Sequence, residues 1–165
     1  MQLHTPKLHP VRYQRGFALL EVLIAVVVLA IGLLGMAALQ SSALRNNQSS
    51  LERTQAVILS YSILEAMRAN LTAARQGNYN MTATSTVPSA GSTLVSKDLN
   101  AWMTDVQASL NDPAAIGSIA CAVSPAPDPS RVCTITITWN DSRGGLNQVV
   151  DAADATKTLT TVGRI

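Results

Sequence analysis

An uninterrupted apolar stretch near the amino terminus constrains this chain more than any other feature of its sequence. The 23 residues from Phe17 to Leu39 contain one charged side chain, Glu21, and no other strongly polar one. A helix of that length spans about 35 Å, which is enough to cross a hydrocarbon core of about 30 Å. The whole chain of 165 residues is 47% hydrophobic and only 13% charged, and this stretch holds much of the excess. We therefore expect a membrane-embedded helix and exclude a plain cytosolic globular protein.

The charges on the two sides of the stretch predict its orientation. The preceding tail carries Lys7, Arg12 and Arg15 and no acid, whereas the first charges after the stretch, from Arg45 onward, lie further from it. Positive flanks stay on the cytoplasmic side of the membrane. We expect a cytoplasmic amino terminus and an exported remainder.

Three interpretations of the stretch compete. A secretory signal peptide cleaved in the small-residue region 37–43 would need an apolar segment of about 7–15 residues, and this one is longer. A second interpretation is an uncleaved anchor. The third rests on Gly16 and Glu21, because a carboxylate in a bilayer costs about 2.5–3.5 kcal/mol and needs a partner. Cleavage after Gly16 would create a positive amine on Phe17, which could pair with Glu21 of a neighbouring subunit.

The residues around this position resemble a known signal. The sequence from Gly16 to Ala25, GFALLEVLIA, follows a short basic leader and opens a long apolar helix. It resembles the class III signal of type IV pilins and pseudopilins. The resemblance implies a leader of residues 1–16, cleavage between Gly16 and Phe17 by a membrane prepilin peptidase, and N-methylation of Phe17. From the charges, we also expect the pairing of this amine with Glu21 of a neighbouring subunit to fix the axial stagger of the assembled subunits.

Further motifs resemble one group of minor pilins, the type IV pilus modification (PilV) family. They are Leu29–Gly35, Leu44–Gln48, Met67–Asn70 and Cys133–Asp141. This resemblance implies co-assembly with other minor pilins and the major pilin at an inner-membrane assembly platform. Such a subunit would prime or cap the pilus and support adhesion and twitching motility. Two alternatives stay open: a minor pseudopilin of a type II secretion system, and a membrane-anchored periplasmic binding module.

Helix-forming residues without proline predict that one helix continues from Phe17 to Arg75, with Gly77 as its C-cap. Residues 17–39 would form its membrane and assembly half and residues 40–76 an amphipathic half that packs on a domain of residues 77–165. Its charged residues should mostly be solvated, among them Glu52, Arg53, Glu65, Arg68 and Arg75.

The remaining residues predict a small α+β domain. We expect a loop at 78–93, then a helix with Ser96 as N-cap and an apolar face, then strands at 119–123, 132–139 and 156–162. The apolar face comprises Val95, Leu99, Trp102, Met103, Val106 and Leu110. Together with the resemblance, this predicts a pilin-like fold, with a long helix on a small antiparallel sheet and a short second helix.

The two cysteines, Cys121 and Cys133, lie on strands expected to face each other in a hairpin. Exported chains are oxidised, so we expect a structural disulfide. A redox-active pair would more often have the Cys-x-x-Cys spacing.

The sequence predicts neither catalysis nor a cofactor. The two histidines, His4 and His9, fall in the expected leader, and neither a phosphate-binding loop nor a dinucleotide motif is present. Basic residues are scattered without interleaved aromatics, which argues against nucleic acid as a partner. We expect no metal site. The loop acids are expected to form turns, and calcium binding by these acids is the alternative. These acids are Asp128, Asp141, Asp151 and Asp154.

Overall fold

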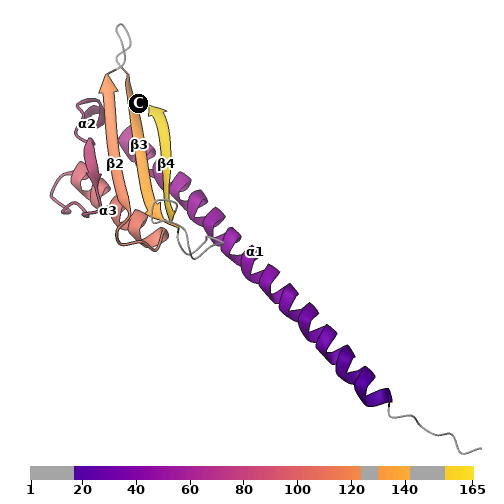
Figure 1. The fold of residues 1–165 in the computed structure, drawn as a ribbon. Helices are drawn as coiled ribbons and strands as arrows, with labels where there is room; N and C mark the ends of the chain where they lie inside the picture. The colour runs from indigo at the N-terminus through magenta and orange to yellow at the C-terminus, as the bar shows by residue number, and fades with distance from the viewer. Residues whose placement is uncertain (1–16, 124–129, 142–154) are drawn as a thin grey trace, which may run out of the picture. The chain divides into compact units, whose positions relative to one another are not determined.

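The computed structural model describes residues 17–123, 130–141 and 155–165 (Figure 1). The expected leader and three loop acids, Asp128, Asp151 and Asp154, lie outside these residues. The chain divides into two compact units, residues 1–41 and 42–165. Among the described residues, the second unit contains four strands and the two shorter helices.

Helix α1 spans Phe17–Ala69, 53 residues without a proline. From residue 42 onward it buries one face, on which apolar side chains recur at helical spacing. Buried on this face are Ala56, Leu59, Ile63, Leu64 and Met67. Glu52 precedes Ala56 by one turn on the same face and is only 5% exposed, so the expectation that this glutamate is solvated is wrong.

The predicted continuous helix to Arg75 is also wrong, because the helix is interrupted at Asn70. This residue leaves the helical region (φ −116°, ψ 54°) between α1 and α2, which spans Leu71–Arg75. Asn70 Nδ2 donates a hydrogen bond to the hydroxyl of Tyr79 at 3.2 Å. Asparagine has a low helix propensity, so a side-chain partner outside the helix can decide its conformation.

Gly77 ends α2, as the sequence predicts. Its φ of +82° is a left-handed conformation that favours glycine. The Gly77 amide donates to the Ala74 carbonyl at 3.0 Å and the Asn78 amide to the Ala73 carbonyl at 3.1 Å. These two bonds form a Schellman motif, which satisfies the last carbonyls of the helix.

The sheet has four antiparallel strands in the order β1-β2-β3-β4. Strands β2 (Ile116–Val123), β3 (Arg131–Asn140) and β4 (Thr156–Arg164) confirm the three expected strands with longer bounds. Strand β1 (Met81–Thr84) falls where we expected a loop. Strand β3 alternates as predicted, and Cys133, Ile135, Ile137 and Trp139 face the core.

Helix α3 spans Leu94–Ser109 and buries the predicted residues Trp102, Met103 and Val106. Its N-cap is Thr93 rather than Ser96, since the Thr93 side chain accepts the Ser96 amide at 3.2 Å. The prediction placed the helix start three residues late because serine also caps well.

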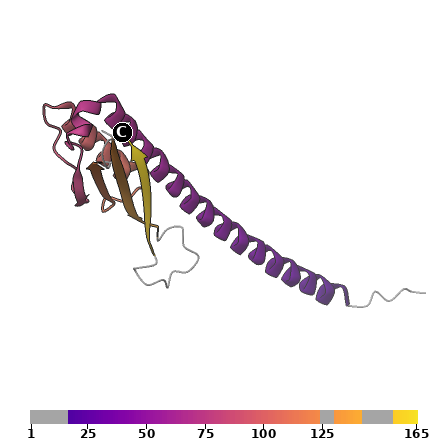
Figure 2. The same ribbon diagram turned by 90° about the horizontal axis from the view of Figure 1, so that it is seen from above.

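Helices α1 and α3 cover the same face of the sheet (Figure 2). A Cβ placed on Gly163 of β4 would meet Leu64 of α1, and one on Gly117 of β2 would meet Trp102 and Met103 of α3. The Trp102 indole also donates to the Leu59 carbonyl at 3.0 Å, which joins the two helices. The α+β fold class with a long helix on a small antiparallel sheet is thus confirmed.

Candidate assembly site on the amino-terminal helix

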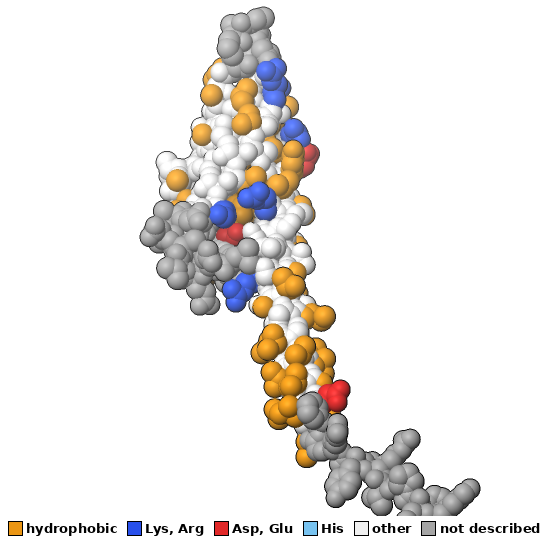
Figure 3. All heavy atoms as spheres, turned by 45° about the vertical axis from the view of Figure 1, so that its right-hand side comes forward, with side chains coloured by type: hydrophobic (Ala, Val, Ile, Leu, Met, Phe, Trp, Pro, Cys, Tyr) orange, Lys and Arg blue, Asp and Glu red, His pale blue; other side chains and the backbone are white. Residues whose placement is uncertain are grey.

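The first part of α1 exposes apolar side chains on every side. Each side chain from Leu19 to Ser41 is exposed, and Figure 3 shows hydrophobic atoms on the face of this part of the helix that is turned to the viewer. A helix in a soluble domain hides one apolar face, whereas an all-round apolar helix belongs in a membrane or a helical bundle. Among the described residues, this helix is the one long and apolar enough to cross a membrane, judged by length and composition.

The structure places Phe17 and Glu21 in the first turns of α1. Phe17 is the first helical residue, and Gly16 lies outside the described residues. Glu21 follows one turn after Phe17, so its carboxylate lies toward the beginning of the helix.

The Glu21 carboxylate is exposed and has no hydrogen bond or ion pair with any residue that the structure describes. Along α1 the first cationic residue is Arg45, in the second unit. A carboxylate in an apolar helix is costly unless it is paired. A partner for Glu21 in an apolar environment therefore has to come from outside this part of α1.

A polar contact in the second unit joins α1 to the end of β3. Ser49 Oγ donates to Asp141 Oδ2 at 2.5 Å, and Asp141 is 6% exposed. Asp141 was one of the four acids for which we considered calcium as the alternative to turn formation. In the described residues, no group of three His, Cys, Asp or Glu side chains is placed to hold a metal ion.

Cys121 and Cys133 occupy directly paired positions on β2 and β3 and form a disulfide. Both are buried against the helices. The bond joins the two central strands on the core side of the sheet.

One comparison with known proteins bears on the amino-terminal helix. Residues 11–37 match the family model described as the prokaryotic N-terminal methylation motif. This match covers the expected cleavage position and the first part of α1. No curated protein and no solved structure matches the chain.

The motif and the fold together support a type IV pilin or pseudopilin. The match carries the prepilin-type signal. The fold supplies the long apolar helix and the small antiparallel sheet. Such a chain is anchored in a membrane, is processed by a prepilin peptidase and takes part in pilus-type assembly.

Proposed function

We propose that this chain is a minor pilin of a type IV pilus, with a role like that of the PilV family. The observation that carries the proposal is the Glu21 carboxylate, which stands alone in an exposed apolar helix, within the residues that match the methylation motif. Further support comes from the PilV-like motifs at residues 29–35, 44–48, 67–70 and 133–141.

The proposed sequence of events starts with the basic leader, which keeps the amino terminus in the cytoplasm while the second unit reaches the periplasm. Prepilin peptidase cleaves between Gly16 and Phe17, and the new amine is methylated. Glu21 then pairs with the amine of a neighbouring subunit, which offsets the cost of its burial and fixes the axial stagger. The second unit faces outward, contacts other minor pilins and the major pilin, and primes or caps the filament.

The test separates processing from assembly. We expect Glu21→Ala to be cleaved at Phe17 normally, as N-terminal sequencing of protein from native membranes would show. We expect its co-purification with other minor pilins to fall at least tenfold, because a lost buried ion pair costs about 3–5 kcal/mol.

Asp105→Ala is the control, since Asp105 is an exposed acid of α3 in the second unit, outside the apolar part of α1. It should leave co-purification unchanged. Normal co-purification of Glu21→Ala would contradict the assembly role. Recovery of secretion-system pseudopilins in place of pilus subunits would favour the type II secretion alternative. A chain that starts at Met1 and is unaffected by Gly16→Val would indicate a simple membrane-anchored module.

A further inference from the structure

Folding brings four arginines from four separate elements to one end of the second unit. Arg68 lies in the last turn of α1, Arg75 at the end of α2, Arg131 at the start of β3 and Arg164 at the end of β4. We call this set the four-arginine end. The sequence shows these residues as scattered, so their convergence appears only in the fold.

Contacts tie Arg68 and Arg131 to the end of β4. Arg68 Nη2 lies 3.5 Å from the Arg164 carbonyl. The backbones of Arg131 and Ile165 exchange two hydrogen bonds of 2.9 Å. Glu65 forms an ion pair with Arg68.

The Arg131 side chain extends from β3 to the neighbouring strand β2. Its Nη1 donates to the Cys121 carbonyl at 3.4 Å. The same atom would lie 3.8 Å from a Cβ on Gly77, two residues after Arg75. This guanidinium is therefore held beside the edge of β2.

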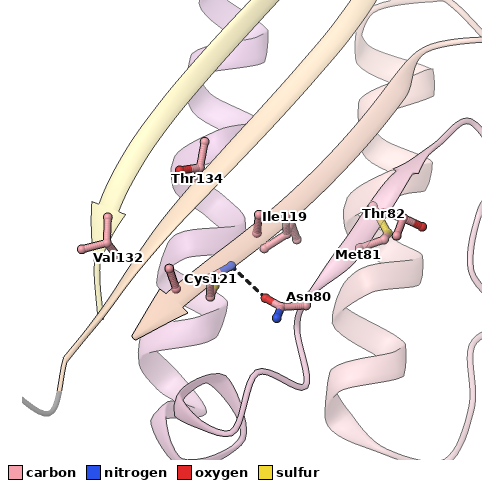
Figure 4. A pocket seen from close by; sticks show the side chains of 9 residues that line it. Asn80, Met81, Thr82, Ile119, Cys121, Val132 and Thr134 are labelled. Atoms are coloured by element: carbon pink, nitrogen blue, oxygen red, sulfur yellow. Dashed lines mark hydrogen bonds between the residues drawn. The ribbon is translucent and has the colours of Figure 1, made fainter. Parts of the chain in front are cut away.

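An open pocket of about 530 Å³ lies next to these arginines, along β1, β2 and β3 (Figure 4). Most of its lining is apolar and includes Met81, Ala122 and Val132. Asn80 lies at the β1 side, and its Oδ1 accepts the Cys121 amide at 2.8 Å.

Two of the arginines flank this pocket. Val132 of the lining is paired with Arg164 on the neighbouring strand, and side chains of such pairs lie about 5 Å apart at Cβ. Arg131 points to the opposite face of β3 from Val132, and its guanidinium reaches the pocket only at the edge of β2, where it contacts the carbonyl of the lining residue Cys121. Figure 3 shows blue Lys and Arg atoms beside orange hydrophobic atoms at the upper end of this unit.

The composition of this surface favours one kind of partner. Guanidinium groups bind planar anions in bidentate geometry, which carboxylates and phosphates offer. Nucleic acid is disfavoured, because the net charge is only +2 and the 4% of aromatic residues provide few stacking platforms. Arginine next to an apolar pocket is instead typical of the centre of a protein interface.

We propose that the four-arginine end docks an acidic polypeptide segment of a partner protein. Carboxylates of the segment bind Arg131 and Arg164, and an adjacent apolar side chain enters the pocket. This docking does not depend on Glu21 or on the apolar helix, so it stands whether or not the chain assembles into a pilus.

The test uses the full chain in detergent and a fluorescein-labelled peptide of alternating Glu and Leu, measured by fluorescence anisotropy at low salt. We expect Arg131→Ala with Arg164→Ala to weaken binding by about 2- to 25-fold, since each exposed ion pair is worth about 1.4- to 5-fold. Ala122→Phe fills the pocket without changing charge and should weaken binding severalfold. Arg53→Ala, an exposed arginine of α1 outside the set, should leave it unchanged.

Each other outcome overturns the proposal. Equal binding of a Lys and Leu peptide, or no effect of the substitutions, would show that the surface does not select acidic segments. Tighter binding of duplex DNA that depends on the same arginines would assign the surface to nucleic acid. If the double variant does not fold, peptide binding by the single variants Arg164→Glu and Ala122→Phe tests the proposal instead. Thermal unfolding checks that both of these variants are folded.

Discussion

Gly163 of β4 lies so close to Leu64 of α1 that a single methyl group does not fit between them. A Cβ on Gly163 would come within 2.7 Å of Leu64 Cδ2. Gly163 is also paired with Cys133 on β3, so the strand cannot shift away without disturbing the disulfide-bonded pair. We expect Gly163→Ala to lower the free energy of unfolding by about 1–3 kcal/mol, as overpacked cores do.

Urea unfolding of the full chain in detergent checks this prediction. Gly35→Ala is the matched control, because nothing lies within 4 Å of the added Cβ. Leu64→Ala in the Gly163→Ala background should recover part of the loss that overpacking causes. Wild-type stability of Gly163→Ala would mean that the contact between α1 and β4 is looser than described.

Tyr79 should make the stability of the second unit depend on pH in the alkaline range. Burial, together with the hydrogen bond from its hydroxyl to Asp98, raises the pKa of Tyr79 to about 12. The unfolded value is about 10, so the native state holds this proton more tightly and stability falls as pH rises from about 10 to 12. The full loss from this one group is about 2–3 kcal/mol.

Urea unfolding between pH 9 and about 11.5 measures this slope, and Tyr79→Phe isolates the contribution of the tyrosine. The variant loses the hydrogen bonds with Asp98 and Asn70, which should cost about 1–2 kcal/mol at neutral pH. Its stability should fall less steeply above pH 10 than that of the wild type. Identical slopes would place the Tyr79 hydroxyl in contact with water.

The disulfide between Cys121 and Cys133 should contribute measurably to stability. The two residues are 12 positions apart, and a loop of that size is worth about 3 kcal/mol in the chain-entropy model. We expect a thiol reductant, or Cys121→Ala with Cys133→Ala, to lower the free energy of unfolding by about that amount. The reductant should not affect the double variant, and a wild-type chain insensitive to it would contradict this account.

Gly77 should tolerate few replacements, because its φ of +82° is disfavoured for residues with a Cβ. Gly77→Ala should cost about 1–2 kcal/mol, and its new Cβ would lie 3.3 Å from Asn80 Nδ2. Gly77→Asn should cost less, since asparagine visits this conformation more readily. Thermal unfolding compares the stability of the wild type, Gly77→Ala and Gly77→Asn. Equal losses of stability for the two variants would argue against the left-handed cap.

The periodicity of apolar residues was sufficient to predict the elements that have one face in the core and one face in solvent. Strand β3 and helix α3 have strong apolar periodicity, and both form where predicted, with longer bounds and an earlier start for α3. Strand β1 was missed because Met81–Thr84 is short and lies in a Ser, Thr and Asn-rich stretch, so its pairing with β2 decides its conformation. Asn70, where the helix is interrupted, likewise forms a hydrogen bond with Tyr79 that no local pattern encodes.

Of the two candidate sites, one can be predicted from the sequence and the other cannot. The motif from Gly16 to Glu21 is contiguous and can be read directly from the sequence. The four-arginine end cannot, because Arg68 and Arg164 are far apart in the chain and meet only through the packing of β4 on α1. The burial of Glu52 was missed since its position on the helix face depends on which residues the sheet covers.

The strand order has a consequence for how quickly the second unit can form. In the part of the chain that the structure describes, each strand pairs with the strands next to it in sequence. Pairing between strands that are neighbours in sequence loses less loop entropy than pairing between distant strands, which favours rapid formation of the sheet itself. A chain that becomes available from its amino terminus can add β2, β3 and β4 in the order of their synthesis. The unpaired strand edges that promote aggregation then exist only briefly.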